Sequence, residues 1–383
     1  MSKIIDGHWT YPTNMIVGPG TLAQLPGACA ALGMKRPLLV TDVGLKDLPM
    51  VQNALAQVPQ CGLFADVQGN PVAENVDAGV KAFHQGAHDG IIAFGGGSAL
   101  DVGKAIALMV GQDRPLWDFE GIEDHWTRVN VAGVAPVVAV PTTAGTGSEV
   151  GRASVITNAE TSEKKIIFHP SMMPATVISD PELTLSLPPH ITAATGIDAF
   201  VHCFEALCAP GYHPMAEGIA LEGMRLISEA LPKAYADGNN VQARADMLVA
   251  ASMGATAFQK GLGGVHALAH AIGGLFNVHH GLTNAVLLPY VMLANQDAIQ
   301  EASERTARIL ALSNPTFESL LAWVLSFRKS LGIPETLLDL GLAESDAKRV
   351  GERAHKDPCA SGNPLPFDAQ DYEAIYRRAF KCL

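Results

Sequence analysis

The sequence is poor in charge and has no excess of basic residues. Charged residues make up 17% of its 383 residues, against about a quarter in a typical globular protein. The 38 Asp and Glu residues outnumber the 26 Lys and Arg residues, which leaves a formal net charge of −12 with His neutral. Because such a chain has little to neutralise phosphates in bulk, we expect no nucleic-acid partner.

Clustered cysteines and long apolar runs are also missing. The six cysteines are scattered without a C-x-x-C pair, so we expect free thiols rather than a disulfide framework. No apolar run approaches the roughly 18 residues that a membrane-spanning helix needs. The opening residues reach Asp6 and Gly7 before the core of a signal peptide could form. These absences favour a cytoplasmic enzyme that binds no membrane.

The first half of the chain alternates between strand-like and helix-like segments. Runs that are apolar throughout, which predict strands buried on both faces of a parallel sheet, cover residues 37–42, 90–95, 136–141 and 175–180. The stretches between them, such as 76–88 and 100–110, carry apolar residues at helical spacing. This alternation predicts a layered α/β domain.

From about Pro188 onward, long Ala- and Leu-rich segments replace the strand-like runs. The segments that we expect to be helical cover residues 191–207, 214–235, 240–259, 265–275, 317–331 and 371–382. A chain of this length is too long for one core of ordinary size. We therefore expect two domains, an α/β domain over residues 1–187 and a helical domain over residues 188–383.

A glycine-rich loop follows the second predicted strand and opens the next predicted helix. In this loop, Gly96, Gly97 and Ser98 would let backbone N–H groups approach a phosphate, with the positive end of the helix dipole behind them. Ser98 can also cap the helix. The spacing differs from the usual dinucleotide fingerprint and from the P-loop, and a tight strand-to-helix turn would use the same glycines.

Two further polar features follow predicted strands. Residues 142–148, rich in Thr, Ser and Gly, suit a polar ligand at the carboxyl end of a strand, although an ordinary Ser/Thr turn has the same composition. Asp42 ends the first predicted strand, where a carboxylate can bind ribose hydroxyls and repel a 2′-phosphate, or can cap the next segment. Together the loops predict a nucleotide site, and Asp42 favours NAD over NADP.

A group of histidines interrupts the predicted helices of the second half. Asp198 and His202 are four residues apart, as are His266 and His270, so each pair shares one helix face, and His280 follows. Polar residues are costly in buried helices unless they have partners. One carboxylate with several imidazoles suits a divalent ion such as Fe(II), Zn(II) or Mn(II).

Taken together, these motifs resemble those of the iron-containing (group III) alcohol dehydrogenases over essentially the whole chain. The matching segments are residues 95–98 with Asp101 and Lys104, 142–149, 193–205, 266–289 and 363–364. Among relatives of this kind are the lactaldehyde/1,2-propanediol, ethanol and 1,3-propanediol dehydrogenases. The resemblance implies an N-terminal Rossmann-like parallel α/β nucleotide-binding domain and an all-helical metal-binding domain, as in the dehydroquinate synthase-like fold.

The resemblance also implies roles for the histidine group. Asp198, His202, His266 and His280 correspond to the four metal ligands, with Fe²⁺ as the expected ion, although Zn²⁺ suits the same donors. His270 corresponds to a histidine beside the substrate and nicotinamide. There it could pass the alcohol proton toward solvent, because imidazole titrates near neutral pH.

The cofactor and the reaction follow from the same resemblance. The positions that correspond to NAD contacts are Asp42, Asn70, Gly96, Gly97, Ser98, Thr142, Thr143, Thr146, Ser148, Lys165 and Leu183. The implied reaction transfers hydride between NAD(H) and a small primary alcohol, diol or aldehyde, with the ion acting as a Lewis acid toward the substrate oxygen. The resemblance further implies a homo-oligomer, a dimer or larger.

Other functions stay open at this point. A zinc polyol (glycerol-type) dehydrogenase or a dehydroquinate synthase-like lyase would share the two-domain plan, although one Asp with three His favours the iron group. A metal-dependent hydrolase would have no reason to bind NAD, and a sensing protein would bind ligands without turnover. A zinc peptidase is disfavoured, since Ala267 stands where its motif needs Glu.

Overall fold

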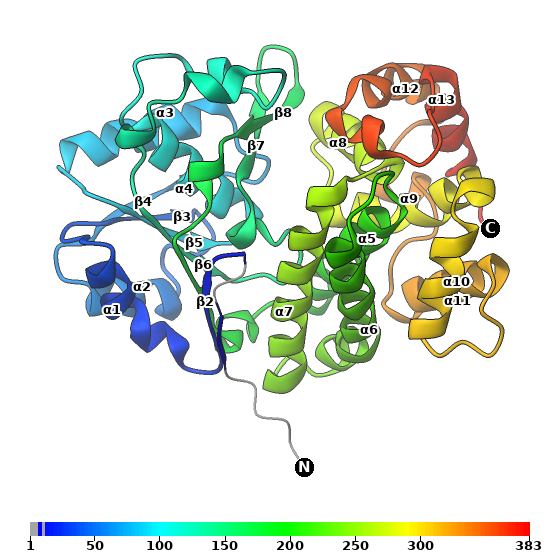
Figure 1. Ribbon diagram of the computed structural model, residues 1–383, viewed down its shortest axis with the longest axis horizontal. Coiled ribbons are helices and arrows are strands. Elements are labelled where there is room, and N and C mark those ends of the chain that lie inside the picture. The colour runs from blue at the N-terminus through cyan, green and yellow to red at the C-terminus, as the bar shows by residue number, and fades with distance from the viewer. Residues whose placement is uncertain (1–6, 10–11) are drawn as a thin grey trace. The chain divides into compact units, whose positions relative to one another are not determined.

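The computed structural model describes residues 7–9 and 12–383 and divides the chain into two compact units (Figure 1). The first unit holds residues up to 143 together with 147–186, and the second holds residues 144–146 together with 187–383. The boundary predicted from the sequence falls after residue 187. The structural division falls after residue 186 and, in addition, groups the short segment 144–146 with the second unit.

The first unit is built on a seven-stranded sheet with the order β1-β2-β9-β6-β5-β3-β4. The strands are β1 (Gly7–Trp9), β2 (Asn14–Val17), β3 (Leu38–Asp42), β4 (Gly62–Val67), β5 (Ile91–Gly95), β6 (Val137–Pro141) and β9 (Thr176–Ser179). Strand β1 runs antiparallel to β2, and the other neighbours pair in parallel. The four predicted apolar runs became β3, β5, β6 and β9, which confirms the parallel α/β domain.

Strands that the apolar runs did not predict lie toward the edges of this sheet or outside it. Strand β4 is an edge strand in which Leu63 is 42% exposed, so it is not buried on both faces, and its short apolar run ends at Asp66. A separate two-stranded hairpin pairs β7 (Ala153–Asn158) with β8 (Glu163–Phe168). Its Thr157 forms a bridge to Val72.

Helices cover both faces of the sheet. They are α1 (Leu25–Ala31), α2 (Pro49–Gln57), α3 (Ala73–Gln85) and α4 (Gly97–Met109). Figure 1 shows α1 and α2 on one side of the strands and α3 and α4 on the other. Leu25 and Val51 pack with Leu39, Ile92 and Phe94 of the sheet in one buried cluster. The helices packed on both faces of the sheet therefore hold β5 and β6, and with them the loops that follow these strands, in place.

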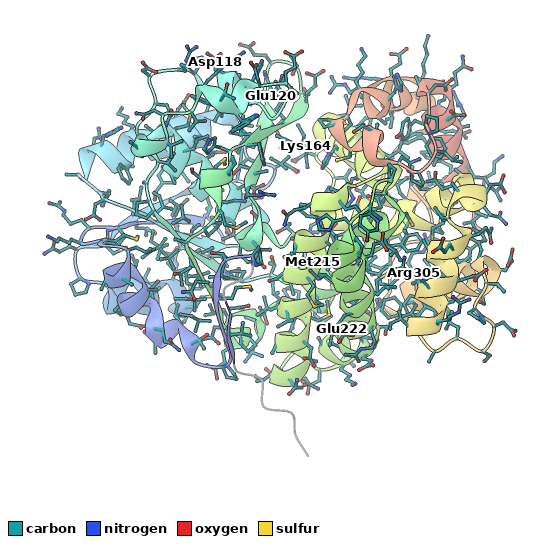
Figure 2. The ribbon with its side chains drawn as sticks, viewed as in Figure 1. Asp118, Glu120, Lys164, Met215, Glu222 and Arg305 are labelled. Carbon is teal, nitrogen blue, oxygen red and sulfur yellow. The ribbon has the colours of Figure 1, made fainter. Side chains whose placement is uncertain are left out.

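The second unit is helical, as predicted. Its helices are α5 (Pro189–Cys208), α6 (Pro214–Ala236), α7 (Val241–Ala257), α8 (Gly264–Phe276), α9 (His280–Ala294), α10 (Gln300–Ile309), α11 (Phe317–Ser330), α12 (Ala347–Lys356) and α13 (Ala369–Arg378). Helix α5 packs against α6, α7 and α9 (Figure 1). Charged side chains such as Glu222 on α6 and Arg305 on α10 lie at the surface of the unit (Figure 2).

Helix α5 is long and apolar enough to cross a membrane by length and composition alone. This corrects the expectation that no apolar run is of that length. Within the structure, 83% of its most apolar window is buried, and the helix carries Asp198, His202 and Glu205 at buried positions. The apolar residues of α5 thus form the core of the helical unit, where they surround three polar side chains.

Candidate metal centre and nucleotide loops

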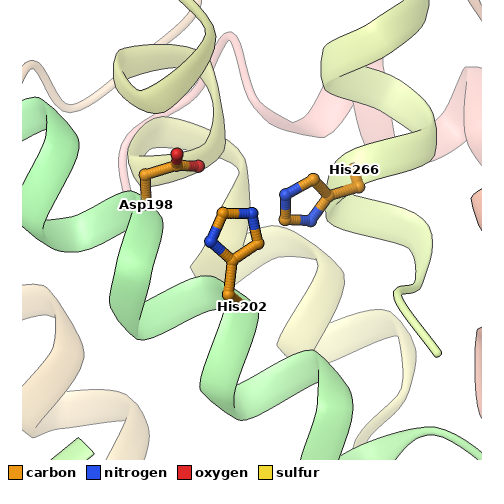
Figure 3. A group of neighbouring side chains, drawn as sticks. All are labelled: Asp198, His202 and His266. Carbon is orange, nitrogen blue, oxygen red and sulfur yellow. The ribbon is translucent and has the colours of Figure 1, made fainter. Parts of the chain in front are cut away.

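Three helices bring the four predicted metal ligands together. Asp198 and His202 lie one turn apart on α5, while His266 comes from α8 and His280 is the first residue of α9. Ligand atoms of Asp198, His202 and His266 all lie within 4.8 Å of one another (Figure 3). The Nε2 atom of His280 is 3.7 Å from Oδ1 of Asp198. Three of the predicted ligands therefore form one close group, and His280 adjoins this group at Asp198.

Burial and neighbouring carboxylates shift the pKa values of two of these imidazoles in opposite directions. Burial lowers the pKa of His202 to about 4, against a weaker opposing effect of Asp198. Burial also disfavours the charged form of His266, but the carboxylates of Glu205 and Asp198 outweigh it, so the pKa of His266 is raised. Metal ligation needs the unprotonated ring. His202 is thus unprotonated and ready for a metal at neutral pH.

Glu205 orients His266 from behind. Its Oε2 lies 2.6 Å from Nδ1 of His266, and its Oε1 accepts the backbone N–H of Val265 at 2.7 Å. A carboxylate on one ring nitrogen fixes the proton there and leaves the lone pair of Nε2 free for a metal. The sequence comparison included Glu205 in a matching motif but assigned it no role. Its distance in sequence from His266 explains why no local pattern could reveal the pairing.

His270 stands beside the four ligands with its own carboxylate partner. Its Nδ1 is 3.0 Å from Oδ2 of Asp357, and its ring stacks on that of His280 with centroids 5.3 Å apart. Asp357 precedes a short 3-10 helix, and the Sγ atom of Cys359 lies 3.9 Å from the same Nδ1. The three residues form a second group of potential ligand atoms, which includes none of the four predicted ligands. Sequence reasoning did not find Asp357.

In the first unit, the two predicted nucleotide loops lie side by side. Strands β5 and β6 pair in parallel up to Gly95 and Pro141, so both loops leave the same edge of the sheet. A Cβ atom at Gly96 would lie 3.4 Å from the side chain of Thr143. Gly96 is the N-cap residue of α4, and Ser98 lies within the first turn, so the prediction that Ser98 caps the helix is wrong.

A buried ion pair ties the second loop to α4. Lys104 donates from Nζ to the carbonyl oxygen of Ser148 at 2.9 Å and lies 3.4 Å from Asp101. The carboxylate of Asp101 accepts the hydroxyl of Ser148 at 2.5 Å and the backbone N–H of Val155 at 2.9 Å. Lys104 and Asp101 match the resemblance but received no role. They fix the position of Ser148, one of the expected NAD contacts.

The remaining expected NAD contacts occupy several places. Asp42 accepts the N–H groups of Gly44 and Leu45 through Oδ1 at 2.8 and 3.1 Å, so it stabilises the turn after β3 and does not cap helix α2, whose N-cap residue is Leu48. Its Oδ2 lies 3.5 Å from where a Cβ on Gly95 would stand, so this oxygen faces the glycine-rich loop. Thr142 is buried and donates its N–H to the carbonyl of Gly95.

Asn70 and Lys165 lie near the β7–β8 hairpin instead. Asn70 has a left-handed backbone with φ of 52°, and the adjoining residue 71 accepts the N–H of Thr157. Lys165 pairs with Ile156 in the hairpin and forms an ion pair of 2.7 Å with Glu120, which Figure 2 labels. Leu183 is buried in the core of the first unit, and Thr146 belongs to the segment that groups with the second.

Comparisons with known proteins match two successive regions of the chain. Residues 12–181 match the iron-containing alcohol dehydrogenase family, and residues 192–380 match its C-terminal region. The chain belongs to the iron-containing alcohol dehydrogenase family. It is therefore an oxidoreductase, and the zinc polyol alternative is not favoured.

Relatives align with the chain over nearly their full length. A 4-hydroxybutyrate dehydrogenase from Cupriavidus necator is 36% identical, covering 96% of this chain and 98% of the relative. An NAD-dependent methanol dehydrogenase from Bacillus methanolicus is 33% identical, covering 97% and 99%. A crystal structure of a 1,3-propanediol oxidoreductase superposes with a TM-score of 0.89 at 37% identity, covering 95% and 98%. The fold expected from the resemblance is thus confirmed.

In this family member, a glycine lets α9 approach α5 closely enough to bring His280 to Asp198. A Cβ atom at Gly281 would lie 2.6 Å from the carbonyl oxygen of Ala194 and 3.1 Å from Cβ of Asp198. Contacts that short force the two helices apart. The close crossing therefore depends on the missing side chain at position 281.

Gly281→Ala is expected to lower the free energy of unfolding by about 1–3 kcal/mol and to reduce metal content. The matched control is Gly218→Ala on the exposed side of α6, where a Cβ would meet nothing within 4 Å. That change should raise stability by about 0.5–1 kcal/mol, since alanine favours a helix. Urea unfolding with metal analysis checks both variants. Equal stability of Gly281→Ala and the parent would contradict the close crossing.

Proposed function

We propose that the chain is an NAD-dependent alcohol dehydrogenase and aldehyde reductase that uses Fe²⁺ and acts on small primary alcohols, diols or aldehydes. The observation that carries this proposal is the convergence of one buried carboxylate and three imidazoles from α5, α8 and α9. The three relatives described above are named for 4-hydroxybutyrate, methanol and 1,3-propanediol, small molecules that share a primary hydroxyl group.

The donor set fits a divalent cation. Asp198 would supply an anionic oxygen, and His202, His266 and His280 would supply neutral nitrogens, a combination that first-row divalent ions accept. When bound, such an ion supplies Lewis-acid chemistry toward the substrate oxygen. Ligand type alone does not choose iron over zinc, because zinc usually binds such donors more tightly. The choice of Fe²⁺ rests on the family to which the chain belongs.

The first unit would hold the NAD. The loop at Gly96, Gly97 and Ser98 opens α4, whose backbone N–H groups and helix dipole suit a pyrophosphate. The hydroxyl of Ser148, held by Asp101, lies on the neighbouring loop. Asp42 faces the glycine-rich loop with one carboxylate oxygen, where it would accept ribose hydroxyls and disfavour a 2′-phosphate. These contacts support NAD as the nucleotide.

His270 would move the alcohol proton. Asp357 holds Nδ1 of His270, which leaves Nε2 on the other side of the ring to exchange a proton. The ring of His270 stacks on that of His280, and its centroid is 5.9 Å from the ring centroid of His266. His270 therefore lies beside the four proposed ligands and is not one of them. This arrangement gives His270 a fixed tautomer next to the place where the substrate hydroxyl would bind.

Reconstitution of the metal-stripped protein tests the proposed function. The protein receives Fe²⁺, Zn²⁺ or no metal under anaerobic conditions, together with NAD and methanol, 1,3-propanediol or 4-hydroxybutyrate. We expect NADH formation only in the samples with Fe²⁺. Turnover with Zn²⁺ alone would move the assignment to a zinc enzyme, and measurable NAD binding without turnover on any alcohol would contradict the proposed substrate class.

A further inference from the structure

Asn284 occupies a position among the proposed ligands that the known reaction does not explain. It lies on α9, one turn after His280, and its side chain is fully buried. Its Nδ2 atom is 2.7 Å from Oδ1 of Asp198, 3.2 Å from Nε2 of His266 and 3.1 Å from Nε2 of His280. One amide nitrogen thus touches atoms from all three helices that build the candidate metal centre.

The chemistry of these contacts identifies the amide as a donor. The carboxylate of Asp198 accepts hydrogen bonds, and Glu205 holds the proton of His266 on Nδ1, which leaves a lone pair on Nε2. An amide nitrogen carries two hydrogens, so it cannot donate to three acceptors at once. It can donate to Asp198 and to one imidazole at a time. The imidazole nitrogens that it reaches are the ones whose lone pairs a metal would need.

The hydrogen bonding of Asn284 differs from that of the buried pair of Asn295 and Asn363. The Oδ1 atom of Asn284 is buried and, among the residues that the structure describes, has no hydrogen-bond partner. By contrast, the buried pair of Asn295 and Asn363 exchanges two amide hydrogen bonds of 2.9 and 2.8 Å, and Asn363 also accepts the N–H of Gly264. Asn284 leaves one polar atom unpaired and directs the other to three proposed ligands.

We propose that Asn284 is a positioning residue of the metal centre: before the metal binds, its two N–H groups hold Asp198 and, in turn, His266 or His280 close together, and afterward it retains Asp198. A metal would take the imidazole lone pairs, while a carboxylate has two oxygens and can keep a hydrogen bond through one of them. This inference rests on the proposed metal site. Loss of such an outer hydrogen bond typically weakens metal binding by about 10- to 100-fold.

The test is Co²⁺ titration of the metal-stripped, full-length protein, followed by visible absorption, which reports the geometry of the bound ion. In Asn284→Leu, which keeps the volume but removes the donor, we expect the Kd for Co²⁺ to rise by about 10- to 100-fold and the absorption bands to shift. The matched control is Asn295→Leu, which lies at the end of the same helix and breaks a buried amide pair. It should lower Tm without changing the Kd.

The outcomes separate this inference from the proposed function. If the parent protein binds no Co²⁺, or if His202→Ala leaves Co²⁺ binding intact, the proposed metal site itself is wrong. If the parent binds Co²⁺ at that site but Asn284→Leu binds equally or more tightly, only the role of Asn284 is overturned. Should Asn284→Leu fail to fold, Asn284→Ser replaces it. The serine side chain is too short to make the hydrogen bonds that Nδ2 of Asn284 makes.

Discussion

Replacing His202 with alanine is expected to lower kcat/KM for alcohol oxidation by about 1000-fold or more. His202 is one of the three closely spaced potential ligands, and it is buried with its pKa lowered to about 4, so it is neutral at the pH of the assay. Its loss would remove Lewis-acid stabilisation of several kcal/mol from the reaction, and each 1.4 kcal/mol corresponds to a factor of ten.

Steady-state kinetics with metal analysis of the purified variant checks this prediction. Metal content should fall together with activity, while NAD binding, which depends on the first unit, should persist. His355→Ala is the control. His355 is an exposed histidine of the same helical unit, and its Nδ1 atom lies at hydrogen-bond distance from the carbonyl oxygen of Phe367. A His202→Ala protein with full activity and full metal content would refute the assignment of this ligand.

Replacing His270 with alanine should lower kcat by about 100- to 10,000-fold without removing the metal. General acid–base groups contribute factors of this size. The ring stacks on His280 but belongs to the separate group with Asp357 and Cys359, so its loss should leave the four proposed ligands in place. The expected result is thus a protein that binds metal and NAD but turns over slowly.

Imidazole added to the solution distinguishes proton transfer from a structural defect. If His270 moves the proton, free imidazole should restore part of the activity of His270→Ala. Asp357→Asn is the companion variant, since it keeps the shape of the partner but removes the charge that orients Nδ1, and it should lose less activity than His270→Ala. Unchanged turnover in His270→Ala, or loss of the metal together with activity, would eliminate the proposed role.

Strands and helices with strong local patterns were predictable from the sequence. Strands β3, β5, β6 and β9 are buried on both faces and were predicted from their apolar runs, whereas the edge strand β4 exposes Leu63 and Asp66 and was not predicted. Helix α9 was not among the helical segments predicted, because Gly281 and Pro289 interrupt it in the sequence. Both residues weaken the helical signal while the packing of the unit maintains the helix.

The site was only partly predictable for a related reason. Pairs four residues apart, such as Asp198 and His202, are visible as spacing on one helix. The partners of those residues are not, because Glu205 meets His266 across 61 positions, Asn284 meets Asp198 across 86, and Asp357 meets His270 across 87. The resemblance to a family identified the four metal ligands. The residues that hydrogen-bond to these ligands and to His270 come from other helices or loops, so only the packing of the structure reveals them.

The most direct test of the account is a crystal structure of the anaerobically loaded protein with anomalous data collected on both sides of the iron absorption edge. We expect a single iron peak within about 2.0–2.2 Å of the carboxylate of Asp198 and of one nitrogen each from His202, His266 and His280. A peak at the group of His270, Asp357 and Cys359 instead, or no ordered iron in a protein that turns over alcohol, would contradict the account.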